Sequence, residues 1–245
     1  MKLILNHVAK AFDDKHVLED VSFTFEEGHI YALLGRNGAG KTTLFSLINE
    51  DLAKDGGTIR IEDGNGLRDV DGRDLGYVLS TPIVPNFLTG REFVRFFMEI
   101  NTNEKATDAR VNEWLDLMDI PEDSRDLLLK DYSHGMKNKM MMVVNFIADP
   151  PVWMLDEPLT SLDVVVADEM KRLLRMKRDG HILIFSTHIM ELALSMCDRI
   201  VLLKDGVLEE LERGDMDEKA FEDMILDALR TERERERARE VTYDV

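Results

Sequence analysis

Residues 35–43 have the types and the spacing of a loop that binds phosphate. They read Gly-Arg-Asn-Gly-Ala-Gly-Lys-Thr-Thr and contain the pattern G-x-x-x-x-G-K-S/T. Glycines let backbone N–H groups turn toward an anion, because no Cβ stands in the way. Lys41 can reach the β- and γ-phosphates, and the Thr42 hydroxyl can ligate Mg²⁺. We therefore expect a nucleoside triphosphate to bind at Gly35, Asn37, Gly38, Ala39, Gly40, Lys41, Thr42 and Thr43.

Two carboxylates follow the apolar run 152–155. A carboxylate at the end of a strand holds Mg²⁺ in enzymes that have such a phosphate loop. A second carboxylate beside it can take a proton from the attacking water. Two acids at a strand end can also be merely solvated. After a phosphate loop, we predict that Asp156 is a metal ligand and that Glu157 is the catalytic base.

A histidine follows the apolar run 182–185, with Ser186 and Thr187 between them. A lone histidine is more often structural. However, ligands of α/β proteins bind at the carboxyl ends of parallel strands. A histidine at that edge can donate a hydrogen bond to a γ-phosphate oxygen. We therefore predict that His188 is catalytic, together with Lys41 and Glu157.

Apolar runs alternate with helical patterns around these residues, which favours an α/β fold: a P-loop NTPase core with a mainly parallel sheet. Short apolar runs on either side of the Asp13–Asp14 turn predict an N-terminal antiparallel β subdomain. The turn Asp205-Gly206 predicts a hairpin. The expected strands of the core are 29–34, 75–79, 152–155 and 182–185, and the expected helices are 41–48 and 164–178.

Between Thr89 and Lys130 the sequence has a helical pattern, because apolar residues recur there every three to four positions. This predicts an inserted α-helical subdomain. We expect one nucleotide-binding domain over residues 1–245. Within it, 1–80 and 136–213 form the ATP-binding core, 81–135 the helical subdomain, and 214–245 a charged helical extension. The alternating Glu and Arg residues near its end favour a solvated helix over a partner-binding tail.

The composition of the chain excludes some classes of binding partner. The net charge of −18 argues against nucleic acid and against direct adhesion to an anionic membrane. A single cysteine, Cys197, fits a reducing compartment and is expected in the core. Met136 and Met140–Met142 are expected to pack in the core rather than bind metal. We find no signal peptide and no apolar run that could span a bilayer, so we expect a cytoplasmic protein whose membrane role comes through a partner.

Together these residues resemble the ATP-binding cassette (ABC) family over nearly the whole chain. The segment Tyr132–Lys137 lies where that family carries the signature L-S-G-G-Q, and only Ser133 and Gly135 match it strictly. Ser133 can cap the following helix, whose N-terminus would attract an anion, although Ser-x-Gly is also a common helix start. The resemblance implies that Ser133 and Gly135 bind the γ-phosphate held by another subunit. Two cassettes would then enclose two ATP molecules head to tail.

Three further residues take expected roles from the resemblance. Phe12 falls where an aromatic ring stacks on adenine, although a core Phe on an early strand is nearly as well supported. Asp163 ends the loop that crosses the dimer interface. Ser80 replaces a Gln that touches Mg²⁺ and the attacking water. Serine is shorter, so we expect Ser80 to reach the metal through a water molecule.

The resemblance implies ATP and Mg²⁺ as cofactors and a homodimer closed around nucleotide. It also implies a separate transmembrane permease, docked near Ser80–Arg95, that holds the protein at the inner face of the cell membrane. The segments Tyr132–Lys137 and Leu88–Phe93 resemble cassettes of bacterial drug, peptide and antibiotic exporters, so we expect an exporter.

Two other functions stay open. Ser80 also fits a nucleotide-binding regulatory cassette with weak hydrolysis. A soluble ABC ATPase unconnected with transport is the second alternative. A GTPase is disfavoured, because Asn138-Lys139 is not followed by the Asp of a base-reading Asn-Lys-x-Asp motif.

Overall fold

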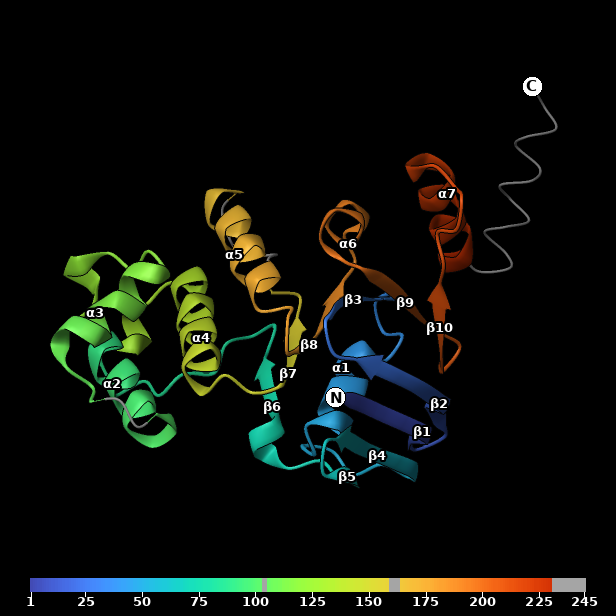
Figure 1. Cartoon of the computed structure of the whole chain (residues 1–245), viewed down its shortest axis with the longest axis horizontal. Helices are drawn as coiled ribbons and strands as arrows, with labels where there is room; N and C mark the ends of the chain where they lie inside the picture. The colour runs from blue at the N-terminus through green and yellow to red at the C-terminus, as the bar shows by residue number, and fades with distance from the viewer. Residues whose placement is uncertain (103–104, 159–163, 231–245) are drawn as a thin grey trace.

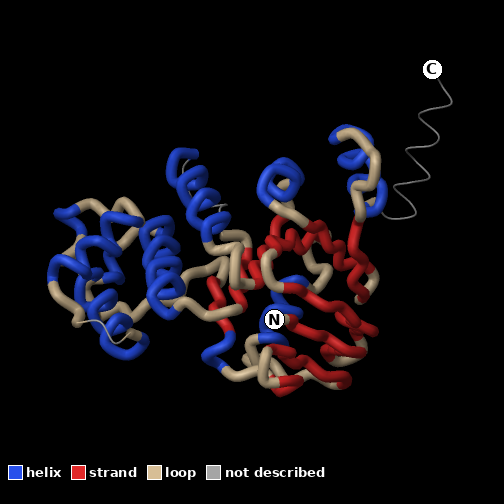
Figure 2. Tube along the Cα trace, in the orientation of Figure 1, coloured by secondary structure: helices blue, strands red, loops and turns tan. Residues whose placement is uncertain are grey.

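The computed structural model describes residues 1–102, 105–158 and 164–230 (Figure 1). Two sheets occupy one half of the molecule, and a group of helices lies at the opposite end (Figure 2). The phosphate loop lies close to both sheets, because Gly35 is beside Leu203 of the larger sheet and Gly40 is beside Val17 of the smaller sheet.

The larger sheet has six strands in the order β10-β9-β3-β8-β7-β6. The five strands from β9 to β6 are parallel to their neighbours, and β10 pairs antiparallel with β9 through a hairpin at Asp205-Gly206. The predicted mainly parallel core is therefore confirmed. The strands are β3 (His29–Leu34), β6 (Leu75–Val78), β7 (Val152–Asp156), β8 (Ile182–Thr187), β9 (Arg199–Lys204) and β10 (Val207–Leu211).

The four-stranded sheet is antiparallel throughout, in the order β2-β1-β4-β5, and confirms the predicted N-terminal β subdomain. Its strands are β1 (Lys2–Phe12), β2 (Lys15–Glu26), β4 (Gly56–Asp63) and β5 (Gly66–Asp69). The sequence did not predict β5, because its four residues include one apolar side chain, Leu67, and that side chain is exposed.

Side chains of the larger sheet alternate between two apolar clusters, as the two-residue period of a strand requires. Tyr31, Met154 and Ile184 face α1 (Lys41–Ile48) and the antiparallel sheet. Their neighbours Ala32, Leu155 and Phe185 face the opposite cluster. That cluster also holds residues of α5 (Val164–Met176), α6 (Met190–Met196) and α7 (Glu218–Leu229).

The expected helical insert is present as α2 (Gly90–Asn101) and α3 (Asp108–Leu117), followed by α4 (His134–Ala148). Thr89 and Glu92 form a capping box that begins α2. Three short 3₁₀ turns, Gly72–Asp74, Glu122–Ser124 and Leu129–Asp131, complete the elements. No helix among the described residues is long and apolar enough to cross a membrane.

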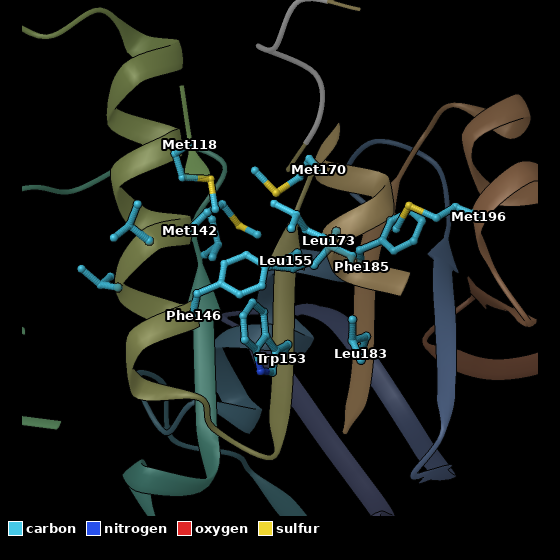
Figure 3. Close-up of a cluster of buried hydrophobic side chains, with 14 of the residues drawn as sticks. Met118, Met142, Phe146, Trp153, Leu155, Met170, Leu173, Leu183, Phe185 and Met196 are labelled. Atoms are coloured by element: carbon cyan, nitrogen blue, oxygen red, sulfur yellow. The ribbon is translucent and has the colours of Figure 1, made fainter. Parts of the chain in front are cut away.

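The apolar core between α4 and the sheet is drawn in Figure 3. Phe146 meets Trp153 edge to face, with 4.9 Å between ring centroids. Met140 and Met142 are buried there, as predicted, whereas Met136 and Met141 are only partly buried against the same cluster. Cys197 packs against the same cluster, and burial raises the pKa of its thiol well above the usual value.

Gly90 fixes a close contact between α2 and the segment that leads into α4. A Cβ on Gly90 would collide with the hydroxyl of the buried Tyr132, which donates to Ser124 O at 2.9 Å. We expect Gly90→Ala to lower the free energy of unfolding by about 1–3 kcal/mol through overpacking. Urea denaturation measures this. Gly64→Ala, where a Cβ meets no atom within 4 Å, is the matched control. Equal stability of the two variants would contradict the prediction.

Candidate nucleotide-binding site

The phosphate loop joins β3 to α1. Gly40 is the N-cap of α1 with a φ of 105°, and a Cβ there would come 2.8 Å from Val17 Cγ1, so glycine is required. No acidic residue occupies the first turn of α1. The unpaired N–H groups and the dipole at this helix end therefore favour a bound anion.

Lys41 lies inside this loop and is 7% exposed. Its Nζ donates to Gly35 O at 2.7 Å and to Arg36 O at 3.2 Å. Burial lowers the pKa of Lys41, while Glu157 and Asp156 act against that shift. The ammonium group is thus placed, with little access to water, where a phosphate would neutralise it.

Asp156 ends β7 beneath the loop and is 3% exposed. Its Oδ2 accepts from Thr42 Oγ1 at 2.8 Å, and its Oδ1 accepts from the Ser186 hydroxyl. Mg²⁺ prefers oxygen ligands such as carboxylates and hydroxyls. Proteins usually supply one or two of these ligands, and the phosphates of the substrate supply others. Thr42 and Asp156 therefore fit a Mg²⁺ ion. Among the described residues no group of three His, Cys, Asp or Glu side chains suits a metal.

Glu157 and His188 form a pair at the ends of β7 and β8. Glu157 Oε1 lies 2.9 Å from His188 Nδ1. The backbone of Glu157 has a φ of 51°, in the left-handed region that non-glycine residues seldom adopt. This backbone directs the side chain to the cavity beside the loop, where it can act as a base.

These side chains surround one cavity of about 600 Å³. Phe12 lies at the end of β1 and is 45% exposed, with Lys10 Nζ 5.4 Å from its ring centroid. The alternative of a core Phe is therefore wrong. The cavity is lined by Phe12, Lys15, Val17, Asn37, Gly38, Gly40, Lys41, Thr42, Thr43, Ser80, Asp156, Glu157 and His188.

Other predicted site residues lie elsewhere. Gly35 lines an adjoining cavity of about 350 Å³, and the Ala39 amide donates to Arg36 O at 3.0 Å. Ser133 caps α4 by accepting from Met136 N at 3.2 Å, and neither it nor Gly135 lines the cavity beside Lys41. Asp163 lies outside the described residues.

Sequence reasoning did not find Lys15 and Val17, which line the cavity from β2. The signal for them was the Asp13–Asp14 turn. A hairpin turn brings the residues on either side together, so a site at Phe12 implied neighbours on the returning strand.

The fold and this cavity define a P-loop protein of the ATP-binding cassette class. Residues 18–160 match the family model described as ABC transporter. The chain belongs to the ABC transporter family.

Relatives agree with this assignment. The sulfate/thiosulfate import ATP-binding protein CysA 2 of Agrobacterium fabrum is 34% identical over 84% of this chain and 62% of its own length. The ABC transporter ATP-binding protein YtrB of Bacillus subtilis is 34% identical over 87% of this chain and 72% of its own. The chain thus spans less than two thirds of the first relative.

Two solved structures share the fold. One, described as the ATP binding subunit of an ABC transporter, aligns with a TM-score of 0.75 and 28% identity over 86% of this chain and 90% of its own. The other is a dimeric cassette in a post-hydrolysis state with ADP and Pi. It aligns with a TM-score of 0.74 and 23% identity over 86% of this chain and 99% of its own.

Proposed function

We propose that this protein binds and hydrolyses ATP to power a separate membrane permease. The supporting observation is the convergence of Lys41, Asp156, Glu157 and His188 on one cavity beside a phosphate loop. Phosphoryl transfer needs positioning and charge stabilisation more than covalent chemistry by the protein, and this cavity offers both.

In this proposal the loop amides and Lys41 hold the β- and γ-phosphates, and Phe12 stacks on the adenine from the rim of the cavity. Thr42 would ligate Mg²⁺, Asp156 would hold the ion through its water shell, and Ser80, which lines the same cavity, would also reach it through water. The ion would supply positive charge against the phosphate oxygens.

Glu157 then acts as the base that takes the proton of the attacking water. His188, whose Nδ1 lies 2.9 Å from Glu157 Oε1, donates toward the γ-phosphate as negative charge grows there. Lys41 stabilises the same charge from inside the loop.

We further propose that a second copy of the chain completes the site. Ser133 is the exposed N-cap of α4, and the half-buried Gly135 lies in the first turn, where a capped helix N-terminus can meet a phosphate on another molecule. Asp163 would cross the same interface. A related cassette of the same fold is a dimer with ADP and Pi, which supports this arrangement.

The permease is proposed to dock beside the helical insert. An apolar cavity of about 440 Å³ opens there, lined by Ile83, Pro85, Phe87, Leu88, Phe93, Phe96, Phe97, Met141 and Val144. Phe87 is 77% exposed and Ile83 71%, which is unusual for large apolar side chains on a highly charged protein. This position would keep the protein at the inner membrane face through the permease alone.

We expect Phe87→Glu to abolish co-purification with a polytopic membrane protein from detergent-solubilised membranes. A buried charge facing an apolar partner segment costs several kcal/mol. Pull-down with the tagged chain measures this. Leu67→Glu, an exposed apolar residue on β5, is the matched control and should retain the partner. Retention of the partner by Phe87→Glu would place the docking surface elsewhere.

The direction of transport is proposed as export, on the two motifs that resemble exporter cassettes. The import names of the sulfate relatives do not support that direction. Loading of substrate into inside-out vesicles that carry the complex would support export, and ATP-driven release from them would contradict it.

The function itself is tested by phosphate release from purified wild-type protein with ATP, with and without Mg²⁺. We expect hydrolysis that depends on Mg²⁺. The regulatory alternative, suggested by Ser80, instead requires nucleotide binding with almost no phosphate release. If the protein neither bound nor hydrolysed ATP, both the ATPase function and the regulatory function would be contradicted.

A further inference from the structure

The hydroxyl of Ser186 connects the two acidic residues of the site. Ser186 is fully buried, at 0% exposure. Its Oγ donates to Asp156 Oδ1 and accepts from the Glu157 backbone N–H at 3.1 Å. A serine hydroxyl has one proton to donate, and here that proton is used on Asp156.

The sheet places Ser186 in this position by register. Asp156 and Ser186 are opposite each other in the parallel pair β7–β8. Ile182 and Ile184 face the cluster on the α1 side, and Ser186 is the next residue of that face. A hydroxyl buried on this face would be costly without partners, and the end of β7 provides both of them.

Ser186 fixes the orientation of the Asp156 carboxylate. Asp156 Oδ1 accepts a hydrogen bond from the Ser186 hydroxyl, so Oδ2 is directed to Thr42. Oδ2 lies 2.8 Å from Thr42 Oγ1, where Mg²⁺ is proposed to bind. Without the Ser186 hydroxyl, Oδ1 would lose this donor on a carboxylate that is only 3% exposed. The carboxylate would then turn to recover a donor.

Ser186 also restrains Glu157. The Glu157 N–H is shared between Ser186 Oγ at 3.1 Å and Ser186 O at 3.2 Å. These bonds hold a residue whose φ of 51° is seldom adopted outside glycine. Such a conformation persists only where neighbours determine it.

We propose that Ser186 is a positioning residue that aims Asp156 at Mg²⁺ and Glu157 at the attacking water. This inference rests on the proposed ATPase function. Partners that orient a metal-binding carboxylate change metal affinity or activity by about 10- to 100-fold when removed.

The test measures the dissociation constant of ATP in Mg²⁺ and in EDTA by calorimetry. It is done in the Glu157→Gln background, where ATP should persist. The ratio of the two constants reports how much Mg²⁺ strengthens binding. We expect Ser186→Ala to reduce this ratio by about 10- to 100-fold. In chains that keep Glu157, we expect kcat to fall more than KM rises.

Tyr31→Phe is the matched control. Tyr31 lies on β3, is 0% exposed, and its hydroxyl accepts from the Glu26 N–H at 2.8 Å. This variant loses one buried hydroxyl away from the cavity and should keep the wild-type ratio. If Ser186→Ala does not fold, Ser186→Cys replaces it, because a thiol of similar size is only a weak donor.

An unchanged Mg²⁺ ratio in a folded Ser186 variant would overturn the inference and leave the ATPase proposal standing. A reduced melting temperature with an unchanged ratio would also overturn it, since it would show a structural role only. If the Glu157→Gln protein bound ATP with the same dissociation constant in Mg²⁺ and in EDTA, both proposals would be overturned.

Discussion

Glu157→Gln is expected to reduce ATP hydrolysis by about 10²- to 10⁴-fold, the usual contribution of a general base. Glutamine keeps the shape of the side chain but cannot take a proton from water. The phosphate loop and Lys41 are untouched, so ATP binding should be retained. Phosphate release measures the rate, and calorimetry measures the binding.

Glu62→Gln provides the control, because Glu62 is an exposed residue of β4 that does not line the cavity. It should hydrolyse ATP at the wild-type rate. Hydrolysis by Glu157→Gln at more than a tenth of that rate would mean that another group activates the water.

Lys41→Ala is expected to fail at the earlier step of nucleotide binding. The ammonium group is buried within the loop and is held by two carbonyl oxygens, whereas Lys15, which also lines the cavity, lies on β2 outside the loop. Removing a preorganised group that stabilises phosphate charge costs about 10²- to 10³-fold in kcat. We expect ATP affinity to fall as well, because a charge-assisted contact is lost in a site sheltered from water.

Lys54→Ala is the control that shows whether the loss of ATP binding is specific to Lys41 or follows from removing any lysine. Lys54 is exposed in the turn that precedes β4. Calorimetry with ATP and Mg²⁺ should give the wild-type dissociation constant for Lys54→Ala and little heat for Lys41→Ala. Equal hydrolysis rates for wild type and Lys41→Ala would remove the basis of the enzyme assignment.

Much of this fold was predictable because its signals are local. The strand before Lys41, the helix after it and the apolar runs that end at Asp156 and near His188 each follow from a few adjacent residues. Parallel strands place their carboxyl ends at one edge, and the structure brings Lys41, Asp156, Glu157 and His188 to one cavity.

The missed features depend on contacts between distant parts of the chain. Ser186 looked like a polar residue at the end of an apolar run, and only its register with Asp156 shows what it touches. The place of Phe12 depended on where β1 ends relative to the loop. Ser133 does not line this chain's own cavity, so the proposal assigns it a phosphate bound to a second copy of the chain.

The molar mass of the Glu157→Gln protein in solution tests the central claim, that two chains enclose ATP at this site. With ATP and Mg²⁺, light scattering should give twice the 28.1 kDa of one chain, and without nucleotide it should give 28.1 kDa. Adding Ser133→Arg should return the mass to one chain while ATP still binds. A protein that binds ATP and stays at 28.1 kDa would contradict the account.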